Sequence, residues 1–331
     1  MDAKTAEQAR LFENRLLKRS RHLKKRFRKA VVYSYRLYDR DIPEIPLCLD
    51  RYEDTDGRAY LVLYAYERPY QKDEAAEKIW LDAMKKTASH TLNIAPEHIF
   101  VKTRRKQKNR QTEAGQYEKY GVDDFYITTI EGGLRFCVNL SAYTDTGLFL
   151  DHRILRSRIR EEAQNKSVLN LFCYTGSFSV YAAAGGASRI DSVDLSAPYL
   201  DRASYNFKLN GFINKDRFRF IRSDALNFLR KTKQKWDIII LDPPTFSNSK
   251  KTDTVFDINR NWPQAVSLCM HHLNEGGILY FSTNSRTLKF DETLLRALCS
   301  FSFNTCDIGA QTIPEDFRNK RIHRCWRIVR N

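Results

Sequence analysis

The chain contains 331 residues, with 56 Lys and Arg against 40 Asp and Glu, so its formal net charge at neutral pH is +16. Apolar residues make up 42% of it, and Gly and Pro number only 13 and 9, which excludes collagen-like, low-complexity and wholly disordered chains. At roughly 150 residues per domain, the length predicts about two domains. No apolar run approaches the ~20 residues that span a bilayer, and the basic N-terminus lacks the apolar stretch of a secretory signal.

The seven cysteines include no CxxC pair and no grouping with histidine at the spacing of a zinc site. An odd number of cysteines in a chain of this size favours reduced thiols over a disulfide framework. The sequence therefore predicts a cytoplasmic protein that holds no metal.

Two short segments carry most of the excess positive charge. Residues 1–30 hold eleven Lys and Arg against three acids, and residues 102–120 hold seven against two. Cations clustered in this way are typical of a protein that binds a phosphate backbone. A basic face that only contacts water is the alternative. An anionic membrane is disfavoured because the segments lack large apolar faces.

The first expected element is a helix over residues 4–30, which contain neither Gly nor Pro. Phe12, Leu16, Leu23 and Phe27 fall on one stripe of this helix, by which it should dock. Its cations should then face nucleic-acid phosphates, and removal of residues 1–30 should weaken binding and flatten its salt dependence. The residues expected to bind are Arg15, Lys18, Arg19, Lys24, Lys25 and Arg28.

Two prolines in Ile42-Pro43-Glu44-Ile45-Pro46 end the helical region. The next part of the chain is expected to form a small α+β domain with a helix over 72–93 and strands near 46–52, 58–66, 98–103, 124–130 and 134–140. Its loop at 104–120 holds the second basic cluster, where the expected binding residues are Arg104, Arg105, Lys106, Lys108 and Arg110. The expected domains are a basic helix and linker (1–42), this small domain (43–140) and a larger domain (141–331).

Apolar strands alternate with helical stretches from about residue 141. The strands are expected at 167–172, 189–194, 217–222, 236–241 and 278–283. Such alternation predicts a parallel, doubly wound α/β sheet. Two further strands, near 301–308 and 322–329, should close this sheet as an antiparallel pair, for seven strands in all.

Polar residues follow the first three strands of this sheet. The first strand leads into Asn170-Leu171-Phe172-Cys173-Tyr174-Thr175-Gly176-Ser177, at the switch point where a nucleoside binds. Its single glycine disfavours a pyrophosphate ligand. Asp194 ends the second strand and can accept from ribose hydroxyls, whereas Asp191 falls inside that strand. Asp224 ends the third strand and either faces an adenine or caps the helix at 225–231. Asp194 could likewise be a turn or cap residue.

The fourth strand ends in Asp242-Pro243-Pro244-Thr245-Phe246. The two prolines fix the chain and leave carbonyls that neighbouring backbone donors do not use. Asp242 adds an acceptor and Phe246 adds an aromatic face. Together they could hold a planar, amino-bearing group beside a ligand of the first strand; a proline-rich turn with a core Phe is the alternative.

The order of these motifs resembles a class I S-adenosylmethionine (SAM)-dependent methyltransferase. Longer strings narrow the likeness to the guanine-N7 methyltransferase half of the fused bacterial 23S rRNA methyltransferase. These strings are Asp145-Thr146-Gly147-Leu148-Phe149-Leu150-Asp151-His152-Arg153, Asp242-Pro243-Pro244-Thr245-Phe246-Ser247-Asn248-Ser249-Lys250, His323-Arg324-Cys325-Trp326 and Tyr35-Arg36-Leu37-Tyr38-Asp39. The resemblance implies a Rossmann-like methyltransferase sheet, SAM as cofactor, and 23S rRNA or a large-subunit assembly intermediate as partner.

The resemblance also implies roles for matching positions. Asn170, Tyr174 and Gly176 should surround the methionine end of SAM, Asp194 the ribose and Asp224 the adenine. The full set expected around SAM is Phe149, Asp151, Arg153, Asn170, Phe172, Tyr174, Gly176, Asp194, Leu195, Asp224 and Ala225. The residues expected to hold the target base are Asp242, Pro243, Pro244 and Phe246.

The absence of a suitably placed thiol separates guanine from cytosine as the target. Enzymes that methylate cytosine C5 first add a cysteine to C6, and related sequences carry that cysteine after the fifth strand. Here the string is Ser282-Thr283-Asn284-Ser285. Guanine N7 has a free lone pair, so its methylation needs alignment and no general base. A methyltransferase acting on a protein amide and a non-catalytic RNA-binding module are the remaining alternatives.

The sequence departs from the fused family in one respect, because no counterpart of the N2-guanine methyltransferase half is present in it. A separate partner enzyme could supply that half.

Overall fold

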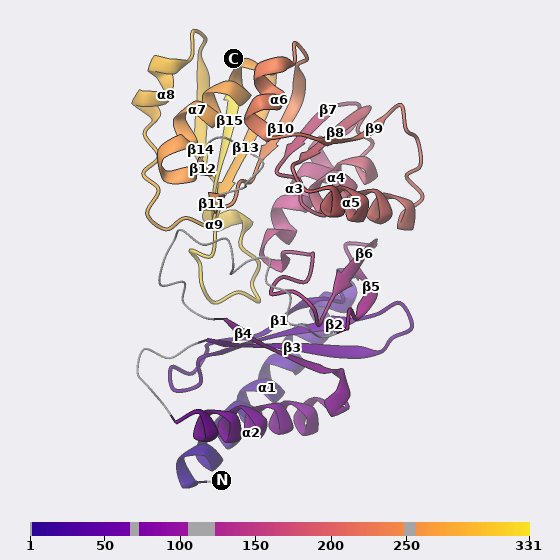
Figure 1. The fold of residues 1–331 in the computed structure, drawn as a ribbon, viewed down its shortest axis with the longest axis vertical. Coiled ribbons are helices and arrows are strands. Elements are labelled where there is room, and N and C mark those ends of the chain that lie inside the picture. Colours follow the sequence, from indigo (N-terminus) through magenta and orange to yellow (C-terminus); the bar gives the residue numbers. More distant parts are fainter. Residues whose placement is uncertain (1, 67–72, 105–122, 248–255) are drawn as a thin grey trace. The chain divides into compact units, whose positions relative to one another are not determined.

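The computed structural model describes residues 2–66, 73–104, 123–247 and 256–331, and Figure 1 labels its elements. The chain folds into two compact units. The first contains the described residues up to 146 together with Glu315–Asn319, and the second contains 147–314 and 320–331. The expected domain boundaries after residues 42 and 140 stay predictions. No helix among the described residues is both long enough and apolar enough to cross a membrane.

The second unit is built on a seven-stranded sheet in the order β14-β15-β13-β10-β7-β8-β9. Its strands are β7 (Ser167–Leu171), β8 (Arg189–Asp194), β9 (Phe218–Arg222), β10 (Trp236–Leu241), β13 (Leu273–Thr283), β14 (Phe303–Asp307) and β15 (Arg324–Arg330). β7, β8, β9, β10 and β13 pair in parallel, and β15 is antiparallel to both of its neighbours. The expected doubly wound sheet with an antiparallel last pair is therefore confirmed.

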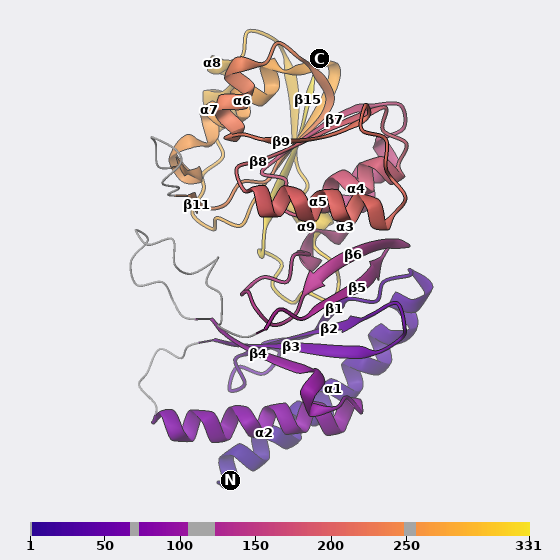
Figure 2. The same cartoon turned by 45° about the vertical axis from the view of Figure 1, so that its right-hand side comes forward.

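Helices cover both faces of this sheet (Figure 2). One face carries α3 (Arg153–Glu162), α4 (Ser177–Ala184) and α5 (Ala197–Leu209), and the other carries α6 (Ala225–Lys231), α7 (Ile258–His271) and α8 (Glu292–Leu298). The strands are nearly continuous apolar runs because both faces are buried. The short helices η3 (Leu150–His152) and α9 (Gly309–Thr312) and the two-stranded pair of β11 (Phe246–Ser247) and β12 (Phe256–Asp257) complete the unit.

The first unit contains a four-stranded sheet in the order β1-β2-β3-β4. Its strands are β1 (Tyr35–Asp39), β2 (Leu47–Glu53), β3 (Ala59–Tyr66) and β4 (Ile99–Arg104), packed with α1 (Ala3–Lys29) and α2 (Glu74–Leu92) around one apolar core. The 3-10 turn η1 (Pro96–His98) precedes β4, and β5 (Tyr126–Glu131) forms a separate hairpin with β6 (Leu134–Asn139). All the strands expected here are present, and β1 is one that the sequence did not predict.

Helix α1 docks by the stripe that its sequence predicts. Phe12, Leu16 and Leu23 are fully buried and Phe27 is 5% exposed. Gln8 lies on the same side, donates to the carbonyl of Glu44 and accepts from the Trp80 indole. The helix is therefore part of the core of the first unit and not an appended arm.

A segment distant in sequence also belongs to the first unit. In Glu315–Asn319, the buried Asp316 carboxylate accepts from the Arg36 amide at 2.9 Å. The Asp39 carboxylate accepts from the amides of Arg318 and Asn319 at 2.9 and 3.1 Å. These bonds satisfy two buried carboxylates, which would otherwise be costly to desolvate.

Candidate active site

The carboxyl ends of three neighbouring strands lie at one edge of the seven-stranded sheet. Leu171 of β7 pairs with Val193 of β8 and with Leu241 of β10. The residues that follow therefore lie at the same edge, and they include Asp194 and Asp242. Because β8 lies on one side of β7 and β10 on the other, this edge is the topological switch point, where α/β sheets bind ligands.

The loop from Phe172 to Gly176 has an unusual backbone. Phe172, Tyr174 and Gly176 have φ angles of 55°, 50° and 73°. A Cβ on Gly176 would lie 2.7 Å from the Cβ of Ala203 in α5. Glycine is therefore required here both by conformation and by the close approach of the helix, and strain of this kind clusters at ligand sites.

Asp194 fastens this loop to the end of β8. Its Oδ2 accepts from the Tyr174 amide and its Oδ1 from the Ser196 amide, both at 2.9 Å. Burial raises the pKa of the Asp194 carboxyl, although the amides that donate to it oppose the shift. Each carboxylate oxygen can accept more than one hydrogen bond, so this half-buried group can also take ribose hydroxyls.

Asp191, the competing acid of β8, has a structural role. It is fully buried, pairs with Arg219 at 2.5 and 2.8 Å, and accepts from the Trp236 indole. Its oxygens are thus used inside the unit, and Asp194 is the acid at the edge.

The other residues expected around SAM occupy different depths. Asn170 is 1% exposed and donates to the Ser179 hydroxyl, so its amide lies behind the loop. The Tyr174 ring lies 5.4 Å from the Phe149 ring and 4.5 Å from that of Tyr199, centroid to centroid. Tyr174 therefore packs against two other aromatic rings. Phe172 and Leu195 are half-buried, and the Phe172 ring lies 5.5 Å from that of Phe256.

Asp224 caps helix α6. Its Oδ1 accepts from the Asn227 amide at 2.9 Å, as the capping alternative requires. Ala225 is 3% exposed at the first position of that helix. The adenine contact of these two residues stays a prediction, and the cap does not exclude it because Asp224 is half-buried.

The segment after β10 places a carboxylate, two prolines and an aromatic ring at the same edge. Ser282 of β13 donates to Oδ1 of Asp242, and Oδ2 of Asp242 lies 3.6 Å from Nε2 of His152. Pro243 is buried, and Pro244 and Phe246 are half-buried. These four residues, expected to hold a base, form a short wall beside the β7 loop.

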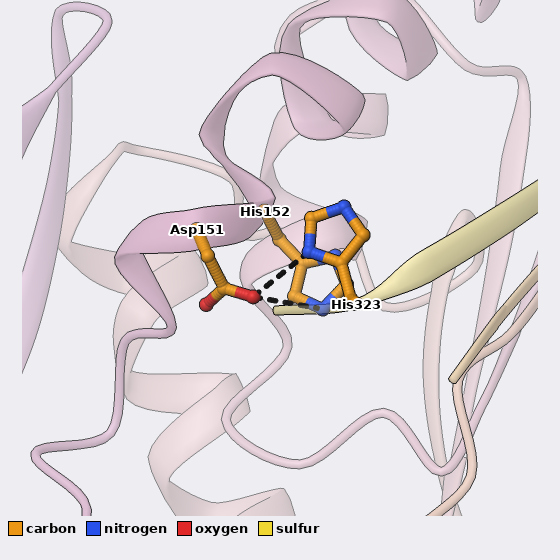
Figure 3. A group of neighbouring side chains, drawn as sticks. All are labelled: Asp151, His152 and His323. Atoms are coloured by element: carbon orange, nitrogen blue, oxygen red, sulfur yellow. Dashed lines mark hydrogen bonds and ion pairs between the residues drawn. The ribbon is translucent and has the colours of Figure 1, made fainter. Parts of the chain in front are cut away.

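Asp151 contacts two histidines. Its Oδ2 accepts from Nδ1 of His323 at 2.9 Å and lies 3.8 Å from Nε2 of His152 (Figure 3). In Figure 3 both contacts converge on this one oxygen. Arg153, also expected near SAM, is 7% exposed at the start of α3. The cofactor contacts of Asp151 and Arg153 stay predictions.

The two histidines are functional candidates that the sequence did not single out. Their rings stack with centroids 4.3 Å apart and planes 13° from parallel. His152 was hidden in the string that ends at Arg153, and His323 is 171 positions away. His323 could have been predicted from the expected antiparallel direction of the last strand, β15, which it precedes. A strand running opposite to its neighbours starts at the edge where they end.

The shared Asp151 oxygen shifts the pKa values around it. Burial opposes ionisation of Asp151, but His152 and the hydrogen bond from His323 hold the pKa of its carboxyl well below the usual range. Burial lowers the pKa of His152, with Asp242 and Asp151 opposing the shift and His323 adding to it.

Asp151, His152 and His323 present ligand atoms within 4.8 Å of one another, which is close enough for a metal ion. The stacking argues against a shared ion. The lone pair of an imidazole nitrogen lies in its ring plane, and two nearly parallel planes cannot both contain one ion between them. These side chains fit a hydrogen-bonded cluster better than a metal centre.

The expected RNA-binding residues of α1 fall into two groups. Lys18, Lys24, Lys25 and Arg28 are exposed. Arg15 instead pairs with Asp41 at 2.7 Å, and Arg19 donates to the Asp316 carbonyl at 3.1 Å. In the second basic cluster, the main chain of Arg104 ends β4, and its side chain and all of Arg105, Lys106, Lys108 and Arg110 lie outside the described residues.

Comparisons of sequence agree with this geometry. Residues 59–296 match the family model described as S-adenosylmethionine-dependent methyltransferase. The chain is 43% identical over 322 residues to the ribosomal RNA large subunit methyltransferase K of Neisseria meningitidis serogroup B, covering 96% of this chain and 86% of that protein. It is also 42% identical over 327 residues to the ribosomal RNA large subunit methyltransferase K/L of Pseudomonas putida. That match covers 98% of this chain and 43% of the longer protein.

Comparisons of structure give the same fold at lower identity. SMU.776, described as a methyltransferase and solved with SAH, has a TM-score of 0.70 and 22% identity, covering 97% of this chain and 81% of that one. A SAM-dependent methyltransferase from Agrobacterium tumefaciens has a TM-score of 0.55 and 20% identity, covering 86% of each chain.

Proposed function

Because this chain belongs to the S-adenosylmethionine-dependent methyltransferase family, we propose that it transfers the SAM methyl group to N7 of a guanine in 23S ribosomal RNA. The substrate follows from the relatives, which are named as ribosomal RNA large subunit methyltransferases. The proposed target atom is supported by the wall formed by Asp242, Pro243, Pro244 and Phe246. That wall offers acceptors and an aromatic face but no nucleophile.

The burial of the two cysteines nearest the site is the observation that favours guanine over cytosine as the target. Methylation at cytosine C5 requires a thiolate at the base. Cys325 pairs with Ser282 across β13 and β15, close to Asp242, but it is fully buried, and burial raises the pKa of its thiol well above the usual value. Cys173 is 5% exposed in the β7 loop, and burial raises its pKa in the same way. Neither thiol is suited to attack a base.

The residues of the β7 edge fit SAM. The turn at Gly176 brings the loop against α5 so closely that no Cβ fits. The half-buried Asp194 can accept from a ribose, and the Tyr174 and Phe149 rings offer apolar surface to the methionine end. When bound, SAM supplies an electrophilic methyl group on a sulfonium. The remaining task of the chain is to align N7 with that methyl, within ~3.5 Å of it.

The wall after β10 is suited to read guanine. Guanine presents two adjacent donors, N1–H and the N2 amino group, which match the two oxygens of a carboxylate. Asp242 supplies that carboxylate. N7 lies in the deep groove of duplex RNA, which side chains do not reach, so the base must be exposed or flipped.

Phe246→Ala is expected to reduce methylation of 23S rRNA. Stacking of an aromatic ring on a base contributes roughly 1–3 kcal/mol, so kcat/KM should fall about 5- to 150-fold, with SAM affinity unchanged. Initial rates with labelled SAM measure this effect. Phe246→Tyr is the matched control and should retain most of the rate. Wild-type kinetics in Phe246→Ala would show that the ring does not stack on the target.

The exposed cations of α1 are proposed to bind rRNA phosphates and so to position the substrate without selecting its sequence. The structure changes how this proposal is tested. Removal of residues 1–30 would remove Phe12, Leu16, Leu23 and Phe27 from the core of the first unit and so unfold it. Substitutions at the surface avoid that problem.

Replacing Lys18, Lys24, Lys25 and Arg28 together by Gln is expected to weaken rRNA binding and to flatten its salt dependence. For every phosphate that the variant no longer neutralises, the slope of log K against log salt should decrease by about 0.7–0.9. Fluorescence binding titrations at several salt concentrations measure the slope. The matched control replaces four exposed lysines of the second unit, Lys208, Lys215, Lys231 and Lys235, by Gln. Equal slopes in both quadruple variants would contradict the assignment.

Transfer of a labelled methyl group from SAM tests the substrate class. The proposal expects label in 23S rRNA when the protein is incubated with rRNA and ribosomal proteins together. Label in ribosomal protein alone would favour the amide alternative and overturn the proposal.

A further inference from the structure

A buried cluster of Asp151, His152, His323 and Thr312 lies behind the wall that is proposed to hold the base. The side chain of His323 is fully buried, and those of His152 and Asp151 are 8% and 14% exposed. The cluster draws on three separate elements: η3, α9 and the residue before β15. Nε2 of His152 lies 3.6 Å from Oδ2 of Asp242, one of the proposed base-holding residues.

The partners of His323 assign its protons. Its Nδ1 lies 2.9 Å from a carboxylate oxygen of Asp151, which can only accept. Its Nε2 lies 2.9 Å from the Thr312 hydroxyl, whose oxygen also lies 2.9 Å from the Gly309 carbonyl oxygen. A ring with its proton on Nδ1 donates to Asp151 and can accept from Thr312 at Nε2. His323 is thus held between Asp151 and Thr312.

The same reasoning assigns the tautomer of His152. Nε2 faces Asp151 and Asp242, at 3.8 and 3.6 Å from their nearest oxygens. Nδ1 is buried and has no hydrogen-bond partner among the described residues. A neutral ring with its proton on Nε2 directs that N–H toward the two carboxylates. Only the lone pair of Nδ1 is then without a hydrogen bond among the described residues.

We propose that His152 is a positioning residue, which holds the Asp242 carboxylate in the orientation that reads guanine and is itself held by Asp151 and by the stacked ring of His323. The inference rests on the proposed function. At 3.6 Å the contact is longer than a hydrogen bond, and catalytic contacts of this kind tighten when substrate binds. Ser282 holds Oδ1 of Asp242, so an N–H from His152 to Oδ2 would fix the plane of the carboxylate.

The groups that face His152 also predict how it responds to acid. They are Asp151 from η3, Asp242 after β10, His323 before β15 and Arg156 from α3. Protonation of His152, at Nδ1, would place a positive charge beside Asp242 and weaken the hydrogen bonds that its carboxylate accepts from guanine. Since burial lowers the pKa of His152, this loss should begin below the usual range of a histidine.

Two variants of His152 test the proposal. His152→Phe keeps a ring that can stack on His323 but removes the N–H, and kcat/KM for 23S rRNA should fall about 10- to 100-fold with the Kd for SAM unchanged. His152→Gln can place an amide N–H near the same point, so it should recover most of the rate. It should also lack the loss of activity at acidic pH. His271→Gln, at an exposed position on α7, is the control and should behave as wild type.

The outcomes separate this inference from the proposed function. If wild-type protein does not form 7-methylguanosine, the proposed function fails whatever the variants do. If it does, wild-type kcat/KM in His152→Phe overturns the positioning role alone. Should His152→Phe not fold, the Gln variant still decides, because an unchanged acidic limb in its pH profile would exclude His152 as the titrating group.

Discussion

Replacing Gly176 by Ala is expected to weaken SAM binding at least tenfold and to destabilise the second unit. A residue other than glycine at φ 73° costs roughly 1–2 kcal/mol. The new Cβ would also lie 2.7 Å from that of Ala203, so α5 or the loop must move. Tyr174 and Asp194 are joined through this loop, and the displacement would separate groups proposed to bind one ligand. Calorimetric titration with SAM measures the effect.

Gly211→Ala is the matched control for that substitution. Gly211 has a similar φ of 75°, but a Cβ there would meet nothing within 4 Å. It should therefore show the conformational cost alone, as a lower melting temperature with unchanged SAM affinity. Wild-type SAM affinity in Gly176→Ala would mean that the β7 loop does not bind the cofactor.

Asp242→Asn is expected to reduce methylation of 23S rRNA by about 100-fold or more. Hydrogen bonds to a charged group contribute roughly 1.5–3 kcal/mol each, and the substitution replaces an oxygen that accepts from guanine by an amide that donates. The SAM affinity should stay at the wild-type value, because Asp194 and the β7 loop are untouched. Steady-state kinetics with rRNA, together with SAM titration, measure the two effects separately.

Asp237→Asn controls for loss of a carboxylate on the same strand. Asp237 lies near the opposite end of β10, where it accepts from Ser167 and Asn274. Asp237→Asn should therefore lower the melting temperature and leave the rate of rRNA methylation near that of the wild type. An equal loss of rate in both variants would show that Asp242 acts through stability and not through the base.

Most of the second unit could be predicted from sequence because its strands are apolar runs buried on both faces. The strands from β7 to β10 were expected within one residue of their observed bounds. β13 begins at Leu273, five residues before its expected start, because Asn274, Glu275, Gly276 and Gly277 have no strand pattern. Leu273 pairs with Trp236 of β10 and Ile278 with Ile238, so the four residues between them form an irregularity within the strand.

β1 was missed for a different physical reason. Arg36 and Asp39 break the apolar pattern of Tyr35–Asp39, yet all five residues are buried. Arg36 pairs with Asp50 at 2.8 Å, and Asp39 accepts from the main chain of Arg318 and Asn319. A charged residue is buried when its partner is present, and these partners are distant in sequence.

The same limit applies to the candidate site. Residues that follow strands, such as Asp194 and Asp242, can be found because parallel strands end at one edge. The contact of the Asp151 carboxylate with His323 could not be found in this way, because no local pattern links the two positions. The role of Arg15 and Arg19 also depends on distant partners, Asp41 and Asp316. Exposure of a cation is set by its neighbours in space, which spacing along a helix does not reveal.

Identification of the methylated nucleoside tests the central claim most directly. The purified protein is incubated with SAM and unmodified 23S rRNA, the RNA is digested, and the nucleosides are separated by chromatography and identified by mass spectrometry. Chromatography is needed because methylation of guanosine at N7 and at N2 adds the same mass. The account predicts 7-methylguanosine with wild-type protein and its near absence with Asp242→Asn. Formation of 5-methylcytidine or N2-methylguanosine in its place would contradict the account.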